Sequence, residues 1–294
     1  MGMKWLQMTL AGIALLTVAA TAAGQRVVVG STNFAEQLIL ANVYAEVLED
    51  RGIEVEKRLN LGSREIVYPA LKAGEIDILP EYTGALLAHL SEGGDIPARR
   101  PDEVAQKLRE ALPESLEMLQ PADAQNKDTL VVRAETAREH DLDTFSDLAA
   151  VSGDMVVGGP PEMKTRRVGL EGLRDFYGIE FAQFRSLDAG GPVTTGALEN
   201  GDIDVARMFT TQGVIDARGW VVLEDDKELS PAQNLVPVAR AEALDDTIRN
   251  ALNEISASLT NRGLQQMNRA VGVDEREPAD VAGEWVREHG LVAD

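Results

Sequence analysis

Cysteine is absent from this 294-residue chain. The absence excludes disulfide bonds and the attachment of a lipid to an N-terminal cysteine. Stability must therefore come from a large apolar core, for which a hydrophobic content of 44% is sufficient. A chain of this length and composition can form one large domain or two of medium size.

Residues with catalytic or metal-binding spacing are missing as well. The three histidines, His89, His140 and His289, are far apart and lie in polar contexts, which is typical of surface residues rather than of metal ligands or bases. No HExxH, GxSxG or Walker pattern occurs. The sequence therefore predicts no enzyme activity, no metal site and no cofactor.

Long apolar runs are absent beyond the N-terminus. Residues 10–20 form an apolar run that follows the basic side chain of Lys4 and precedes the small residues Ala22 and Ala23. This order is typical of a cleaved secretory signal peptide, and a retained amphipathic anchor is the alternative. We expect residues 1–23 to be removed and the mature protein to be soluble in a bacterial periplasm, without a lipid anchor.

Basic side chains are few relative to acidic ones. The chain has 28 Lys and Arg against 49 Asp and Glu, which gives a formal net charge of −21. Such a surface repels nucleic acid and anionic lipid, so we expect no nucleic-acid partner. It suits a concentrated salt medium, where repulsion is screened, and it also occurs in ordinary acidic exported proteins.

Two segments of the chain, offset by 127 positions, carry nearly the same sequence. Residues 70–84 read ALKAGEIDILPEYTG and residues 197–211 read ALENGDIDVARMFTT. Each contains a helix end, a glycine suited to positive φ, a short strand, and an aromatic residue followed by threonine. The spacing is too long for a solenoid and indicates two lobes of similar build, the alternative being a chance match. The identical pairs are Ala70/Ala197, Leu71/Leu198, Gly74/Gly201, Ile76/Ile203, Asp77/Asp204 and Thr83/Thr210.

Strands and helices alternate in both halves, which favours parallel sheets with right-handed crossovers in an α/β fold. Two similar apolar segments, Thr129–Arg133 and Asn234–Arg240, are expected to pair antiparallel with one another as they cross between the lobes. The helical pattern of residues 245–291 is expected to pack back on the first lobe. We therefore assign residues 24–128 and 238–294 to a discontinuous lobe 1, and residues 129–237 to lobe 2.

Ligands of open α/β sheets bind beyond the carboxyl ends of the strands. Thr32 and Asn33 follow the first strand at a helix N-terminus, where amides can hold a polar group. Asn33 and Glu36 also have the spacing of a capping box, so they can serve the helix instead. Arg166 or Arg167 stands at the matching place in lobe 2, as a carboxylate partner or as part of a solvated surface pair.

The ends of the two repeats offer a further set of candidates. Tyr82 with Thr83, and Phe209 with Thr210, each present a ring and a hydroxyl where a strand ends. The rings can wall a pocket and attract a cation, each contributing about 0.5–2 kcal/mol. Packing in the core or at the hinge is the alternative role for both rings.

The runs GSTNFAEQLIL (30–40) and LNLGSREIVYPALKAGEIDILPEYTGALL (59–87) resemble the substrate-binding proteins of glycine betaine/choline-type osmoprotectant ABC importers. The similarity continues through TRRVGLEGL (165–173), GDIDVARMFTTQGVI (201–215) and DDKELSPAQNLVPVAR (225–240), so it spans essentially the whole mature chain. It implies a bilobed type II periplasmic binding protein fold, in which two α/β lobes joined by a two-strand hinge close on a small zwitterionic or quaternary-ammonium solute. The implied partner is an ABC permease in the inner membrane, to which the protein, as a monomer, delivers that solute.

The resemblance also implies roles for single residues. In that family tyrosines form a cage around the trimethylammonium group and an arginine holds the carboxylate. By motif, Tyr82 is a cage residue, Phe209 falls at a cage position often occupied by tyrosine, and Arg166 is the carboxylate partner. Leu130 and Gln233 stand where cage tyrosines are common, so two rings are missing. Thr32, Ala85 and Gln212 are further departures from the usual contacts.

We therefore expect the solute to be an osmoprotectant such as glycine betaine or, because of the missing rings, a more polar molecule. A sensory module that signals to a chemoreceptor or kinase is the alternative role for the same fold. The predicted ligand-binding set is Thr32, Asn33, Tyr82, Thr83, Arg166, Phe209, Thr210 and Gln233.

Overall fold

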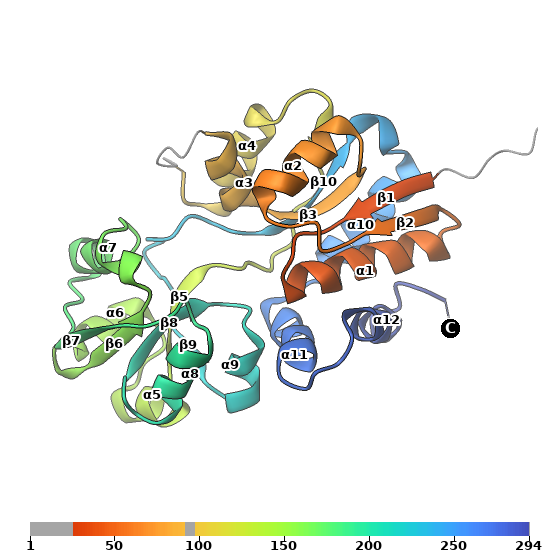
Figure 1. The fold of residues 1–294 in the computed structure, drawn as a ribbon. Helices are drawn as coiled ribbons and strands as arrows, with labels where there is room; N and C mark the ends of the chain where they lie inside the picture. The colour runs from red at the N-terminus through yellow and green to blue at the C-terminus, as the bar shows by residue number, and fades with distance from the viewer. Residues whose placement is uncertain (1–25, 92–97, 294) are drawn as a thin grey trace, which may run out of the picture.

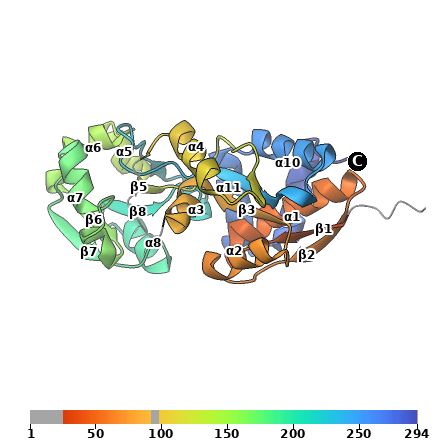
Figure 2. The same cartoon turned by 90° about the horizontal axis from the view of Figure 1, so that it is seen from above.

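The computed structural model describes residues 26–91 and 98–293, so the predicted signal peptide lies outside the described residues. These residues form two α/β lobes, each built around a five-stranded mixed sheet (Figure 1). Seen from above, the lobes lie side by side with the two crossing segments between them (Figure 2). Within the described ranges, no helix combines the length and the apolar character needed to cross a membrane.

The sheet of lobe 1 has the strand order β2-β1-β3-β10-β4. β1, β2 and β3 run parallel, and β10 is antiparallel to both of its neighbours. The strands are β1 (Arg26–Gly30), β2 (Glu54–Arg58), β3 (Ile78–Tyr82), β4 (Leu116–Met118) and β10 (Leu235–Arg240). β3 carries no exposed residue, as expected for a central strand covered on both faces.

Helices cover both faces of this sheet. The long helix α1 is buried along most of its length because α10, α11 and α12 pack against it, as expected for the C-terminal segment. On the other face, the apolar sides of α2, α3 and α4 form a second cluster of buried residues. The helices are α1 (Ala35–Asp50), α2 (Arg64–Ala73), α3 (Thr83–Leu90), α4 (Pro101–Ala111), α10 (Asp246–Ser258), α11 (Asn261–Gly272) and α12 (Pro278–Glu288), with a 3₁₀ turn at Ala241–Ala243.

Lobe 2 repeats this topology with the strand order β7-β6-β8-β5-β9. β6, β7 and β8 are parallel, and β5 is antiparallel to β8 and β9. The strands are β5 (Asp128–Val132), β6 (Val156–Gly159), β7 (Gln183–Ser186), β8 (Val205–Phe209) and β9 (Val221–Val222). The helices are α5 (Ala134–His140), α6 (Phe145–Ala149), α7 (Leu170–Gly172) with a π-helical continuation at Leu173–Tyr177, α8 (Pro192–Glu199) and α9 (Gly213–Arg218), with 3₁₀ turns at Ser152–Asp154 and Pro161–Lys164.

The sequence repeat is a repeat of local structure. Asp77 accepts a hydrogen bond at 2.9 Å from the backbone N–H of Val28, and Asp204 accepts one at 2.9 Å from Val156. The two aspartates therefore tie the segment before β3 or β8 to the first strand of the same lobe, β1 or β6. Gly74 and Gly201 have φ of +77° and +74°, which glycine adopts without strain.

One part of the fold prediction is wrong. β5 and β10 do not pair with one another, because each occupies the fourth position in the sheet of its own lobe. The chain crosses between lobes just before each of these strands, where an isolated antiparallel bridge joins Gln125 to Asn234. The predicted lobe boundaries after residues 128 and 237 consequently cut through β5 and β10.

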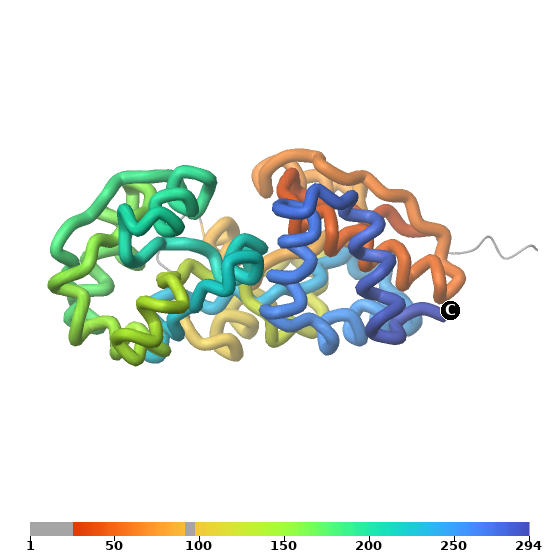
Figure 3. Tube along the Cα trace, turned by 90° about the horizontal axis from the view of Figure 1, so that it is seen from below, coloured from red at the N-terminus to blue at the C-terminus, as the bar shows by residue number. Residues whose placement is uncertain are grey.

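A second contact joins the lobes away from the crossing. α9 of lobe 2 packs directly on α11 of lobe 1, and Figure 3 shows these helices side by side. Arg269 donates to Asp216 at 3.1 Å, and Gln265 donates to the carbonyl of Thr210 at 2.7 Å. The C-terminal helices therefore touch both lobes rather than the first alone.

Candidate functional site

A large cleft of about 1330 Å³ opens between the lobes. Its wall on lobe 1 comes from the start of α1 and the end of β3, and its wall on lobe 2 comes from the end of β8 and the loop before α7. The carboxyl ends of β3 and β8 thus face the same space, as expected for ligand sites in open α/β sheets. No group of three or more His, Cys, Asp or Glu side chains with metal-binding geometry occurs in the two described ranges.

Two aromatic rings form the wall on lobe 1. Tyr82, the last residue of β3, is 6% exposed and lines the cleft. Phe34, at the N-cap of α1, is 42% exposed, and its ring stacks on that of Tyr82 with centroids 6.2 Å apart. A large apolar side chain that remains this exposed at a cleft wall is a candidate ligand contact.

A buried carboxylate lies behind these rings. Glu36 is 3% exposed and accepts hydrogen bonds from the Tyr82 hydroxyl at 2.6 Å, from Asn126 at 2.9 Å and from Asn268 at 2.6 Å. Among residues 26–91 and 98–293, no Arg or Lys pairs with it. Burial, and next the Glu36 charge, raise the pKa of Tyr82 well above its usual value, so its hydroxyl stays protonated and donates to Glu36.

This geometry corrects the expected capping box. α1 begins at Ala35 with Phe34 as its N-cap, and no side chain caps it by hydrogen bonding. Asn33 is exposed and does not line the cleft, and Glu36 turns to Tyr82 instead of back to the helix end. Thr32 is buried outside the cleft wall, and its hydroxyl has no hydrogen-bond partner among the described residues.

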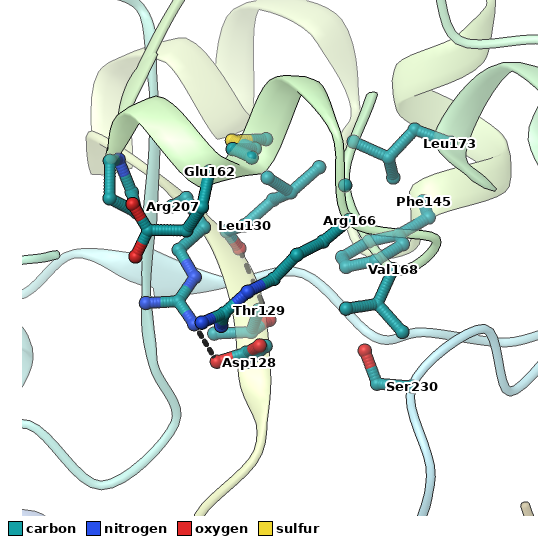
Figure 4. A pocket seen from close by; sticks show the side chains of 13 residues that line it. Asp128, Thr129, Leu130, Phe145, Glu162, Arg166, Val168, Leu173, Arg207 and Ser230 are labelled. Atoms are coloured by element: carbon teal, nitrogen blue, oxygen red, sulfur yellow. Dashed lines mark hydrogen bonds and ion pairs between the residues drawn. The ribbon is translucent and has the colours of Figure 1, made fainter. Parts of the chain in front are cut away.

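The wall on lobe 2 carries two arginines, Arg166 and Arg167, and the carboxylate of Asp128. Arg166 lines the cleft from the loop that follows the 3₁₀ turn at Pro161–Lys164, and Phe209 lines it from the end of β8. The guanidinium of Arg207 lies 4.4 Å from the centroid of the Phe209 ring and pairs with Asp128 on β5. Figure 4 shows Arg166 and Arg207 extending toward Asp128 from different elements, around a small recess beside the cleft.

The structure brings four of the predicted site residues together at the cleft: Tyr82, Arg166, Phe209 and Gln233. The side-chain carbonyl of Gln233 accepts from the backbone N–H of Ala85 at 2.8 Å, and the backbone N–H of Gln233 donates to the side-chain oxygen of Gln125 at 3.1 Å. Gln233 therefore ties the start of α3 to the crossing segment while lining the cleft.

The two repeated threonines do not line the cleft; both bind the crossing segments. Thr83 accepts from the Asn234 N–H at 3.1 Å, and Thr210 accepts from the Lys127 N–H at 3.0 Å and donates to the Gln125 carbonyl at 2.6 Å. Each follows an aromatic residue at the end of a strand, and successive side chains there point in opposite directions. The ring thus faces the cleft and the hydroxyl faces the hinge.

Sequence reasoning missed Phe34 and Glu36 as candidate site residues. Both stand in the NFAEQ run, where Glu36 was interpreted as part of a helix cap. The available signal was the phenylalanine directly before the first helix, in the loop that follows the first strand and so faces the expected ligand site. Nothing local in the sequence indicates that Glu36 meets Tyr82, 46 residues away, and Asn268, 232 residues away.

Comparison with known proteins is consistent with this arrangement. Residues 25–288 match the family described as the substrate binding domain of ABC-type glycine betaine transport systems. The chain belongs to this family. It is 31% identical to the glycine-betaine-binding protein of Pseudomonas aeruginosa, over 95% of this chain and 93% of that protein. It is 28% identical to the glycine betaine-binding protein YehZ of Escherichia coli, over 91% of this chain and 92% of that one.

A solved structure described as a glycine betaine/carnitine/choline ABC transporter superposes with a TM-score of 0.84 at 26% identity, over 90% of this chain and 99% of that one. The expected family and the bilobed α/β fold are therefore confirmed. The protein is the substrate-binding component of an ABC-type osmoprotectant importer.

Proposed function

We propose that this protein captures glycine betaine or a related small zwitterion in the periplasm, between its two lobes, and presents it to an ABC permease in the inner membrane. The acidic surface supports a monomer without a nucleic-acid partner. The relatives named for glycine betaine support the solute class. The placement of charge across the cleft supports the way in which the solute is held.

The observation that carries this proposal is the buried Glu36 carboxylate. Buried charges in proteins are usually paired, because removing an ion from water is costly. Glu36 has hydrogen-bond donors around it but no protein cation among the described residues. A quaternary ammonium group against the wall of lobe 1 supplies the missing positive charge.

The rings beside Glu36 suit the same group. A quaternary ammonium has no N–H to donate, so its recognition depends on ring faces and on nearby negative charge. Tyr82 provides one ring, and Phe34 provides a second that the family motif alone did not indicate. The wall of lobe 1 therefore holds the cationic end of the solute, although Leu130 and Gln233 replace two common cage tyrosines.

The other end of the solute meets lobe 2. Arg166 lines the cleft and has no ion-pair partner within the described part of the chain, so its guanidinium is free to pair with a carboxylate. A zwitterion that touches Glu36 on one wall and Arg166 on the other bridges the lobes. Such bridging favours the closed state, by bending at the crossing segments around Gln125 and Asn234. The closed shape is what the permease recognises.

The test is a charge change at Glu36 with a matched change elsewhere on α1. Glu36→Gln keeps the size of the side chain and removes the charge, so glycine betaine affinity measured by calorimetry is expected to fall about tenfold or more. Glu49→Gln makes the same chemical change at an exposed position of the same helix and is expected to leave affinity unchanged. Equal affinities for the two variants would remove Glu36 from the site. Failure of the wild type to bind betaine, choline or carnitine would reject the solute class.

A further inference from the structure

The two repeats place an aromatic ring at the same position in each lobe, and the rings have opposite surroundings. Tyr82 stacks on another ring, Phe34, and donates its hydroxyl to a carboxylate. Phe209 has no hydroxyl and is covered by a guanidinium, that of Arg207, at 4.4 Å from its centroid. One ring therefore contacts a carboxylate and the other contacts a guanidinium.

Arg207 is held in this place by its surroundings. Its side chain is only 11% exposed, and its charge is paired with Asp128, the residue that stands opposite Phe209 in the β5–β8 register. Gly159 on the neighbouring strand leaves room for it, because a Cβ there would lie 3.0 Å from the Cβ of Arg207. The arginine is thus built into the sheet rather than extended into solvent.

The charge is specific to lobe 2. At the repeat offset that matches Tyr82 to Phe209, the position of Arg207 corresponds to Pro80 in lobe 1, which has no charge. The repeated backbone therefore does not require a cation here.

We propose that Arg207 is a specificity-determining residue. Its guanidinium covers one face of the Phe209 ring and so excludes the cationic group of the solute from this end of the cleft. This inference rests on the proposed function. With Arg166 beside it, Arg207 makes the wall of lobe 2 an acceptor for the anionic end of the solute. The site thereby prefers zwitterions over simple cations of similar size such as choline, and it fixes the orientation of a bound zwitterion.

The physical basis is repulsion across the ring. A cation on the free face of Phe209 would lie about 9 Å from the guanidinium, and like charges at this distance repel by an amount worth about fivefold in affinity at an effective dielectric constant near 40. The Phe209 ring already interacts with the guanidinium of Arg207, so it attracts a second cation less strongly. Asp128 offsets part of the repulsion, so removing its charge should strengthen the exclusion.

The test compares two variants that break the same ion pair from opposite sides. Arg207→Met keeps the length of the side chain and removes the positive charge, and Asp128→Asn removes the negative one. The ratio of the choline to the glycine betaine dissociation constant is measured by calorimetry at one ionic strength for the wild type and both variants. Arg207→Met is expected to lower this ratio about fivefold, and Asp128→Asn is expected to raise it.

A purely structural role for the pair predicts a different result, namely weaker binding of both compounds and the same ratio in both variants. That result, or a ratio that moves in the same direction in both variants, overturns the inference while leaving the proposed function intact. If the wild type binds neither compound, the proposed function fails first and the inference falls with it. Thermal unfolding of both variants confirms that each is folded at the temperature of the titrations.

Discussion

The two lobes share a backbone plan and differ in the charge that they present to the cleft. Both sheets have the same strand order, and both use an aspartate, Asp77 or Asp204, to fix the strand that leads to the cleft. The side chains around the ends of these strands have diverged, with the buried carboxylate of Glu36 beside Tyr82 in lobe 1 and the half-buried guanidinium of Arg207 beside Phe209 in lobe 2. The repeat thus sets the frame of the site, and the residues outside the identical positions set its polarity.

The helices that follow the two repeats differ in a second way. α3 of lobe 1 packs on α4 of the same lobe, whereas α9 of lobe 2 packs on α11 of the other lobe. Equivalent positions in sequence therefore serve the core in one lobe and the contact between lobes in the other. This contact includes Asn268, which donates both to Glu36 and to the carbonyl of Thr211, so it is continuous with the wall of the cleft.

The largest expected effect comes from Gly213, the first residue of α9. A Cβ at this position would overlap backbone atoms of Asn268 and Arg269 in α11, and a helix backbone cannot yield as a side chain can. Gly213→Ala is expected to lower the free energy of unfolding by about 3 kcal/mol or to separate α9 from α11. Chemical denaturation measures the first outcome, and small-angle scattering measures the second.

Gly196, in the middle of α8, is the matched control. A Cβ there meets no atom within 4 Å. Gly196→Ala is therefore expected to raise the free energy of unfolding by about 0.5–1 kcal/mol, through helix propensity alone. If both alanine variants stabilise the protein, the close approach of α9 and α11 does not persist in solution.

The next effect concerns the two rings themselves. Tyr82→Ala is expected to weaken glycine betaine binding about 30-fold, because it removes a ring face that meets the cation and the hydroxyl that binds Glu36. Phe209→Ala is expected to change the affinity by about threefold or less, since Arg207 already occupies that ring. Calorimetry on both alanine variants measures the loss of affinity at each ring. Tyr82→Phe, which keeps the ring and removes the hydroxyl, separates the two contributions of Tyr82. Equal losses at both rings would show a symmetric cage.

Local sequence pattern was sufficient for the lobes and for the rings. The glycine and the aromatic residue of the repeat each have a local reason for their place, and Gly74 and Tyr82 occupy the positions that those reasons predict. Pattern alone indicated Arg166 or Arg167 after a strand of lobe 2, and both line the cleft, whereas the choice of Arg166 came from the family resemblance.

Pairing between distant segments was not predictable in the same way. The segments around β5 and β10 look alike and alternate like strands, so the sequence could not tell that each completes the sheet of its own lobe. Thr83 and Thr210 follow the correct strand, but they face the hinge because side chains alternate along an extended chain. Glu36 has the spacing of a helix cap, and only its distant donors show that it belongs to the cleft.

The smallest expected effect is a pH-dependent loss of stability at the start of α8 in lobe 2. There Asp188 accepts hydrogen bonds from backbone N–H groups of the first turn, whereas no side chain caps α1 in lobe 1. Desolvation opposes ionisation of Asp188, yet its hydrogen bonds with Thr194 and with the N–H of Val193 outweigh it and lower the pKa of this carboxyl below its ordinary 3.8. A lowered folded pKa gives stability that is fully present above the unfolded value and is lost as the pH falls through the folded one. Because Asp188 remains in part exposed to solvent, Asp188→Asn is expected to cost only about 0.5 kcal/mol at pH 7. That cost should shrink below pH 3.8 and disappear once the pH has fallen through the folded pKa, where the wild type protonates. A difference between wild type and variant in urea denaturation that stays constant from pH 7 to strongly acidic solution would contradict this account of the start of α8.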